Sequence, residues 1–287
     1  MKLRAPAKIN LFLKVIREME DGYHQIDTLF ERVSLFDYIY IDTSANARKI
    51  LCDSPDVPTG EDSLIGRTVR AFEESINRKL TFEIKIEKNI PVGAGLGGGS
   101  SDAAAVLTGL SGIMGDILSE EELFRIGGGL GADIPFFLSG ASFGYGSGRG
   151  DIIEKLEKKY DLWHVLVNPP FQISTKDVYS KVSPFTLTNN IAIDKMFTVF
   201  SDTGKRENIA GNLYNDLEAI VLQDFPVLKQ VFSEIREAGA EGVLLSGSGP
   251  TVFGVFRSRS EAESAEKKLV RAFPEEQGWR VFTVNTC

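Results

Sequence analysis

Strand-like and helix-like patterns alternate along the chain, which predicts an α+β protein of two domains. The chain has 287 residues, and single hydrophobic cores usually stop growing at about 250–300 residues. The pattern restarts at Leu162, after a glycine-rich stretch at 144–150. Beyond this point, helical patterns accompany an antiparallel set of strands, which is typical of a ferredoxin-like domain. We therefore expect one domain over residues 1–155 and a second over 156–287.

The first element is a strand at 2–16, in which apolar and polar side chains alternate. Its polar face includes Lys8 and Asn10, and the ordinary interpretation of such a face is exposure to water. Apolar periodicity and turn residues define the elements that follow in the first domain. They are a strand at 28–41, a helix at 64–76, a strand at 80–86, an alanine-rich helix after Ser101, a helix opened by Ser119 and Glu122 and ended by the glycines at 127–129, and a hairpin at 144–150.

The same signals define the second domain, where strands and helices are again short and regularly spaced. A capping box at Ser260 and Glu263 marks the start of its last helix. The expected elements are strands at 162–168, 242–246, 250–256 and 279–285, and helices at 175–182, 211–223, 226–238 and 260–273.

Composition and charge exclude several classes of protein. A hydrophobic content of 43% with 25% charged residues is that of an ordinary globular protein. The net charge of −8, without a basic block, disfavours nucleic-acid binding. No apolar run approaches the roughly 18 residues of a membrane span, and Lys8 and Lys14 interrupt any signal-peptide core. We expect a cytoplasmic protein, a monomer or weak homodimer, whose partner is a small molecule.

Cysteine and histidine are rare, which limits the kinds of metal or disulfide chemistry. Cys52 and Cys287 lie far apart in the sequence, so they form no disulfide framework or thiolate metal site, and they fit a reducing compartment. The two histidines, His24 and His164, exclude a histidine-rich zinc centre.

The glycine-rich loop at 93–101 is the strongest candidate for chemistry. It follows a strand and opens an alanine-rich helix, so bare backbone amides face a helix N-terminus, which favours phosphate. Gly93, Gly95 and Gly98 match G-x-G-x-x-G, but the ribose-binding acid of a dinucleotide site is missing, and no Walker A lysine follows. The alternative is a purely structural helix start.

Four other features each have a structural and a functional interpretation. Asp133 precedes a helical turn, where an acid is most often an N-cap. His24 follows a turn and would ordinarily be a surface histidine, whereas His164 lies in an apolar run and fits the core. The segment 244–253 is either a simple hairpin or a second cluster of backbone amides that faces a ligand.

Residues 91–104 resemble the phosphate loop of the GHMP kinases. Three further motifs, Pro6 to Leu11, Gly22 to His24 and Gly131 to Phe137, are similar to those of the 4-diphosphocytidyl-2-C-methyl-D-erythritol kinases within that superfamily. The resemblance extends from Lys2 to about Phe256. It implies the two-domain GHMP kinase fold, with a left-handed βαβ phosphate-loop unit, a ferredoxin-like second domain and an active site in the cleft between them.

The resemblance also implies roles for individual residues in an ATP-dependent kinase of non-mevalonate isoprenoid biosynthesis. Asp133 would be the base that takes the proton from the C2 hydroxyl of the cytidine diphosphate ester, and Lys8 would orient that hydroxyl. The ATP phosphates would lie against Pro91, Val92, Gly93, Ala94, Gly95, Leu96, Gly97, Gly98, Gly99, Ser100 and Ser101. The ester would lie against Asn10, Tyr23, His24, Phe30, Tyr179, Gly247 and Ser248. Magnesium follows from ATP chemistry, and no residue set identifies its ligands.

Two alternatives stay open at this point, and one position departs from the family pattern. Relatives often have Asn-Leu in the adenine pocket, where this chain has Ser63-Leu64. One alternative is a sister enzyme such as a mevalonate or homoserine kinase, and the other is a non-catalytic nucleotide-binding protein. A coupled ATPase assay with candidate alcohols distinguishes all three.

Overall fold

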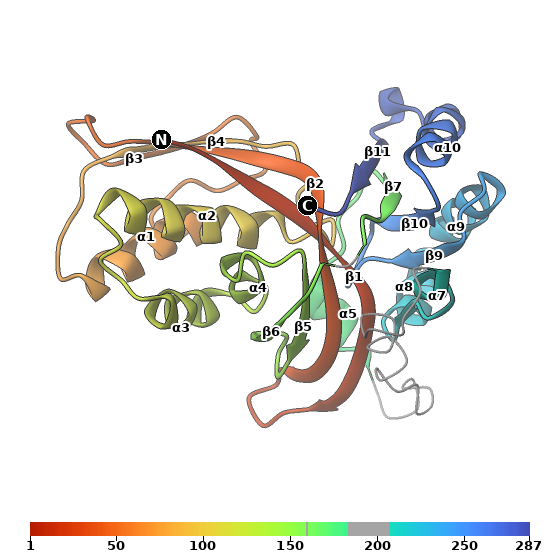
Figure 1. Cartoon of the computed structure of the whole chain (residues 1–287), viewed down its shortest axis with the longest axis horizontal. Coiled ribbons are helices and arrows are strands. Elements are labelled where there is room, and N and C mark those ends of the chain that lie inside the picture. Colours follow the sequence, from red (N-terminus) through yellow and green to blue (C-terminus); the bar gives the residue numbers. More distant parts are fainter. Residues whose placement is uncertain (159, 183–206) are drawn as a thin grey trace.

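The computed structural model describes residues 1–158, 160–182 and 207–287, and it contains two β-sheets with helices packed against them (Figure 1). This arrangement confirms the α+β class that the sequence predicts. The predicted domain boundary at 155/156 falls next to the last residue of the strand Ile152–Leu156. A short strand from the second half joins the first sheet, so the sheets do not divide the chain at this point and the boundary stays a prediction. No helix in the described ranges is long and apolar enough to cross a membrane.

The first sheet has seven strands among the described residues, in the order β3-β4-β2-β1-β8, and the β5–β6 hairpin pairs with β2. The long strands β1 and β2 form an antiparallel pair that runs from the N-terminus to the middle of the molecule and bends there (Figure 1). The strands are β1 (Lys2–Glu18), β2 (His24–Asp42), β3 (Lys49–Cys52), β4 (Glu83–Glu87), β5 (Phe143–Ser147), β6 (Ile152–Leu156) and β8 (Tyr214–Asn215).

Four helices pack beside this sheet and bury an apolar cluster against β2 and β4. The sequence-based end of α3 at the glycines 127–129 was wrong, since α3 continues to Leu130. A Cβ at Gly127 would approach side-chain atoms of Ile134 and Leu138 to 2.8 Å, so this glycine allows α3 and α4 to pack closely. The helices are α1 (Leu64–Ser75), α2 (Gly98–Ile113), α3 (Glu120–Leu130) and α4 (Ile134–Leu138).

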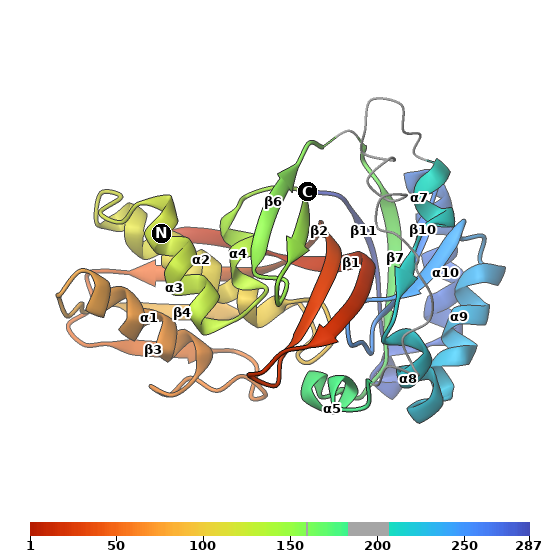
Figure 2. The same cartoon turned by 90° about the horizontal axis from the view of Figure 1, so that it is seen from below.

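The second sheet has the order β11-β7-β10-β9 with antiparallel neighbours, which is the ferredoxin-like arrangement. Helices α9 and α10 cover the face that is turned away from β1 and β2 (Figure 2). The opposite face packs against β1 and β2 in a shared apolar cluster. The elements are β7 (Trp163–Asn168), α5 (Thr175–Tyr179), α9 (Val227–Glu237), β9 (Gly242–Leu245), β10 (Val252–Phe256), α10 (Arg259–Ala272) and β11 (Arg280–Asn285).

Two sequence-based details in this half were wrong. The single helix expected at 211–223 is instead α7 (Glu207–Gly211), β8 and α8 (Glu218–Asp224), because Tyr214 and Asn215 pair with the edge of β1. The N-cap of α10 is Ser258, whose hydroxyl accepts a hydrogen bond from the backbone of Glu261, and not Ser260.

The polar face of β1 is the most important correction for function. The alternation predicted a face exposed to water, but Lys8 and Asn10 are only 5% and 1% exposed. They are buried because other parts of the chain close over the middle of β1, and the two side chains line a cavity there. A buried ammonium needs partners, so this face is a candidate for the site.

Candidate active site

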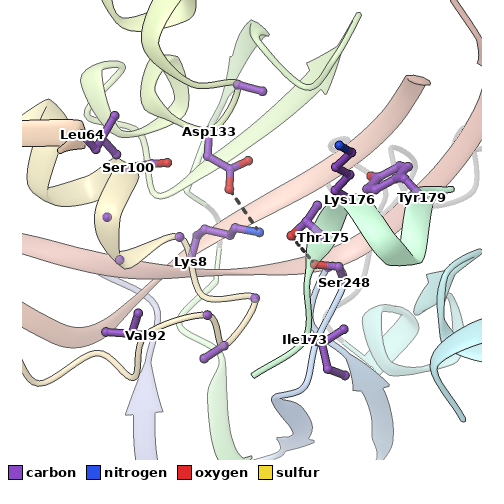
Figure 3. Close-up of a pocket in the computed structure, with 18 of the residues that line it drawn as sticks. Lys8, Leu64, Val92, Ser100, Asp133, Ile173, Thr175, Lys176, Tyr179 and Ser248 are labelled. Atoms are coloured by element: carbon purple, nitrogen blue, oxygen red, sulfur yellow. Dashed lines mark hydrogen bonds and ion pairs between the residues drawn. The ribbon is translucent and has the colours of Figure 1, made fainter. Parts of the chain in front are cut away.

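A cavity of about 1170 Å³ lies between the two halves of the molecule. Its wall combines β1, the glycine loop and the start of α4 with α5 and the turn between β9 and β10. Lys8 and Asp133 point toward each other in the middle of the view, between Leu64 and Val92 on one side and Thr175, Ser248 and Tyr179 on the other (Figure 3). The cavity therefore has two ends that meet at the Lys8–Asp133 pair.

The glycine loop has a backbone shape that only glycine adopts easily. Gly93, Gly95 and Gly97 have φ angles of 64°, 75° and 68°, in the left-handed region that side chains disfavour. Gly97 is the N-cap of α2 and supplies no side-chain hydrogen bond, and no acidic residue lies in the first helical turn. The first amides of this 16-residue helix thus have no side-chain cap at a cavity wall, which is the geometry that binds phosphate.

The loop is held in place from both halves of the molecule. The Lys8 amide donates to the Leu96 carbonyl at 2.9 Å. From the turn after β9, the Ser246 hydroxyl donates to the Gly95 carbonyl at 3.0 Å, and a Cβ at Gly95 would collide with the Ser246 carbonyl oxygen. The segment 244–253 is therefore a hairpin between β9 and β10 whose turn, with Gly247 and Ser248, also lines the cavity.

A buried cluster of charged side chains packs against the end of the glycine loop. Lys88 donates to Asp102 Oδ2 at 2.9 Å and to Asp37, and Asp37 also accepts from the amides of Asn89 and Ile90. Burial alone would lower the pKa of Lys88, but the two carboxylates hold it above its ordinary value. The cluster connects β2, the segment before the loop and the second turn of α2.

Asp102 gives this cluster a pH dependence. Burial raises the pKa of Asp102 to about 7, against the opposing effect of Lys88. A carboxyl group with a raised pKa in the folded state stabilises the fold below its unfolded pKa, and this contribution is lost as the pH rises through about 7. We expect the melting temperature of the parent to fall relative to that of Asp102→Asn between about pH 5 and pH 8. Thermal melts at several pH values test this, with exposed Asp116→Asn as the control, and a pH-independent difference contradicts it.

Lys8 and Asp133 form the centre of the site. Lys8 Nζ lies 3.6 Å from Asp133 Oδ2 and donates to Asn10 Oδ1 at 2.7 Å. Asp133 stands at the N-cap position of α4, as the structural interpretation expected, but its side chain makes no capping hydrogen bond. Its side chain is 31% exposed to the cavity while that of Lys8 is 6% exposed. A carboxylate open to a ligand beside a buried ammonium is suited to accept a proton from a bound hydroxyl.

The aromatic residues expected at the substrate end are only partly together. The rings of His24 and Tyr179 are 5.2 Å apart and both line the cavity, although they are 155 residues apart in the sequence. Tyr23 also lines it but is 57% exposed, and the Arg149 guanidinium lies over its ring. Phe30 also lines the cavity, where it is stacked on Phe136 with Lys8 Nζ 5.5 Å from its ring centre. The Phe30 ring thus lies next to the Lys8 ammonium.

Some expected ligands do not face the cavity, and sequence reasoning missed others. Leu96 and Ser101 belong to the loop but do not line the cavity, and the hydroxyl of Ser101 is buried without a hydrogen-bond partner in the described structure. Ser63 caps α1 by accepting from the Gly66 amide. Thr175 was not predicted, yet its hydroxyl bonds to that of Ser248 at 2.8 Å across the cavity wall. No local pattern distinguishes such a threonine.

The other histidine has a structural environment, as the apolar run around it predicted. His164 is fully buried on β7, and its Nε2 lies 3.0 Å from Glu31 Oε2 on β2. The Thr286 hydroxyl donates to the same carboxylate at 2.6 Å. This cluster joins the two sheets away from the cavity.

Comparisons with known proteins agree with this geometry. Residues 63–141 match the model of the GHMP kinases N terminal domain, and residues 197–275 match that of the GHMP kinases C terminal. The chain is 38% identical over 281 residues to the 4-diphosphocytidyl-2-C-methyl-D-erythritol kinase of Syntrophotalea carbinolica, covering 98% of this chain and 96% of that protein. A second relative of the same name, from Desulfotalea psychrophila, is 38% identical over 99% of this chain and 94% of its own length.

Solved structures give the same result. A crystal structure of 4-(cytidine 5'-diphospho)-2C-methyl-D-erythritol kinase matches with a TM-score of 0.81 and 32% identity, over 99% of this chain and 98% of that chain. Mevalonate kinase of Methanococcus jannaschii shares the fold, with a TM-score of 0.70 at 14% identity over 100% of this chain and 98% of that chain. The chain is a small-molecule kinase, and it belongs to the GHMP kinases, in the family of the 4-diphosphocytidyl-2-C-methyl-D-erythritol kinases.

Proposed function

We propose that the enzyme transfers the γ-phosphoryl group of ATP to the C2 hydroxyl of 4-diphosphocytidyl-2-C-methyl-D-erythritol, a step in non-mevalonate isoprenoid biosynthesis. The observation that carries this proposal is the Lys8–Asp133 pair between the N-terminus of α2 and the His24–Tyr179 pair in one cavity. The names of the relatives from Syntrophotalea carbinolica and Desulfotalea psychrophila support the same substrate.

The residues divide the work of phosphoryl transfer, which needs positioning and charge stabilisation more than covalent help. The amides at the start of α2 and the Ser100 hydroxyl bind the ATP phosphates. Asp133 accepts the proton of the substrate hydroxyl while the C2 oxygen of the substrate forms a bond to the γ-phosphorus. The bond between the γ-phosphorus and the β,γ-bridging oxygen breaks, which releases ADP. The Lys8 ammonium orients the hydroxyl and offsets the charge that develops between substrate and phosphate.

Magnesium belongs to the same proposal. The described residues hold no cluster of three or more histidine, cysteine or acidic side chains that could bind a metal alone. Magnesium in kinases is usually held by one or two carboxylates together with substrate phosphates and waters. The Ser100 hydroxyl lines the cavity beside the phosphate loop, so it would contact the ion together with phosphate oxygens and waters. The ion would neutralise charge on the phosphates.

The cytoplasmic location and the monomeric or weakly dimeric state stay predictions.

The preference of the enzyme for a cytosine or a uracil ring in its substrate provides the test of this function. Stacking on Tyr179 contributes about 1–3 kcal/mol of binding free energy for any nucleobase, so it does not discriminate between cytosine and uracil. Replacing cytosine by uracil leaves the protein groups that pair with cytosine without partners, and each unpaired group costs roughly 1–3 kcal/mol of binding free energy. With His24 at the base edge, we expect kcat/KM for the cytidine ester to exceed that for the uridine ester on the order of 10²-fold. Steady-state kinetics with both esters, mevalonate and homoserine measures this preference.

A variant identifies the residue responsible. His24→Ala should raise KM for the cytidine ester and leave KM for ATP unchanged, because the His24 ring packs against that of Tyr179, which lies across the cavity from Val92 and Ser100 of the phosphate loop (Figure 3). Gln25→Ala is a matched control, since this neighbour does not line the cavity. Equal rates with the two pyrimidine esters refute the role of His24, and faster turnover of mevalonate or homoserine overturns the proposed function.

A further inference from the structure

Thr28 is a buried residue that the mechanism so far leaves without a task. It lies on β2, is fully buried, and does not line the cavity. Its hydroxyl donates to the Phe12 carbonyl at 2.7 Å and accepts from Asn10 Nδ2 at 2.8 Å. Asn10 Oδ1 in turn accepts from Lys8 Nζ. The four groups form one continuous chain of hydrogen bonds that ends at the ammonium beside Asp133.

The direction of every bond in this chain is determined by its two ends. An ammonium can only donate, so the atom of Asn10 that faces Lys8 must be the amide oxygen. The amide nitrogen of Asn10 then faces Thr28, whose oxygen accepts. A backbone carbonyl can only accept, so the single proton of the Thr28 hydroxyl goes to Phe12. A residue at position 28 without an oxygen would take the acceptor from the Asn10 nitrogen and this donor from the Phe12 carbonyl, in a buried place.

The backbone brings these groups together through an irregularity in the β1–β2 ladder. The pairing shifts between Asn10 and Phe12, which is the signature of a β-bulge. Bulges redirect side chains and often lie next to active sites. Opposite, Thr28 pairs with Gly146 of β5, where a Cβ would come within 3.0 Å of the Thr28 methyl group. Thr28 therefore lies between the bulge in β1, which its hydroxyl contacts, and Gly146, whose lack of a side chain leaves room for its methyl group.

We infer that Thr28 is a positioning residue for phosphoryl transfer, which acts through Asn10 to hold the Lys8 ammonium at its distance from Asp133. This inference rests on the proposed function and adds a residue to it. The Lys8–Asp133 distance of 3.6 Å exceeds a hydrogen bond, so Asn10 is the hydrogen-bond partner that orients the ammonium while Asp133 stays free for the substrate hydroxyl. When the Thr28 hydroxyl is absent, the Asn10 amide can rotate and Lys8 loses its fixed orientation.

The central test removes the hydroxyl and keeps the shape. Thr28→Val should lower kcat on the order of 10–100-fold, the effect of misplacing a catalytic group by about 1 Å, and leave KM for ATP unchanged. Thr28→Ser, which keeps the hydroxyl, should restore most of the turnover. Thr68→Val is the matched control, because Thr68 is also fully buried and its hydroxyl donates to a backbone carbonyl at 2.7 Å, yet it lies on α1 outside the cavity wall.

A double-mutant cycle separates positioning from general stability. In an Asn10→Ala background, Thr28→Val should cause no further loss of kcat, because the path from Thr28 to Lys8 is already broken. An equal loss in both backgrounds, or a kcat within about twofold of the parent for Thr28→Val alone, overturns the inference. If Thr28→Val does not fold, Thr28→Cys serves instead, since a thiol is only a weak acceptor.

The same measurements keep this inference separate from the proposed function. A parent enzyme that phosphorylates none of the offered alcohols refutes the proposed function. A parent that is active with the cytidine ester, combined with losses of Thr28→Val and Asn10→Ala that simply add, refutes the role of Thr28 alone.

Discussion

Asp133→Asn is expected to lower kcat by about 10²–10⁴-fold, the usual effect of losing a general base. The amide has nearly the shape of the carboxylate but cannot accept the proton of the substrate hydroxyl. The melting temperature should change little, because the Asp133 side chain caps no helix and is partly open to the cavity. Steady-state kinetics with ATP and the cytidine ester, together with a thermal melt, measures both quantities.

The control for this variant is Asp62→Asn. The Asp62 carboxylate is fully exposed, pairs with Arg70 at 3.4 Å and does not line the cavity, so its loss removes the same charge outside the site. Near-normal turnover of Asp133→Asn would show that another group takes the proton. A large loss of stability with a proportionate loss of activity would assign Asp133 a structural role instead.

Gly97→Val should abolish ATP binding. At φ = 68° a β-branched residue is strongly disfavoured, and a Cβ at this position would lie 3.0 Å from both Lys8 Cγ and Phe137 Cζ. The same side chain would stand at the first turn of α2, where the phosphates approach the amides. Isothermal titration calorimetry with ATP measures the loss, and a circular dichroism spectrum like that of the parent shows that the fold persists.

Two other glycines make this prediction specific. Gly98 has no positive φ, because it is the first residue of α2, and a Cβ there would meet Ile90 at 3.0 Å and Lys88 Nζ at 3.2 Å. Gly129 in α3 has open space around it, so Gly129→Ala should keep ATP binding. An affinity of Gly97→Val within about threefold of the parent, less than 1 kcal/mol, would remove the loop from the ATP site.

The loop and the burial of β1 differ in how far sequence alone could predict them. The glycines of the loop determine their own backbone shape, so a local pattern was sufficient to predict a phosphate site. The alternation in β1 correctly predicted a strand but not the burial of Lys8 and Asn10. That burial depends on contacts with residues more than 80 positions away, and periodicity carries no information about them.

The substrate end depended almost entirely on resemblance. His24 and Tyr179 meet because α5 packs beside the start of β2, and nothing in either local sequence indicates this contact. Thr28 gave no signal at all, since a threonine in a strand is ordinary and its task is visible only from its partners. Family similarity predicted residues that contact the ligands, whereas the structure was needed to find Thr28, which we propose positions Lys8 through Asn10.

The docking of the β9–β10 turn on the phosphate loop has a consequence for the order in which the enzyme becomes competent during synthesis. Gly95 leaves the ribosome 151 residues before Ser246, whose hydroxyl donates to the Gly95 carbonyl. The strand β8, which completes the edge of β1, is also late. Contacts this distant in sequence form slowly. A nascent chain therefore carries its glycine loop without the bond from Ser246 until the β9–β10 turn has emerged, and we expect the capacity to consume ATP to arise only after that point.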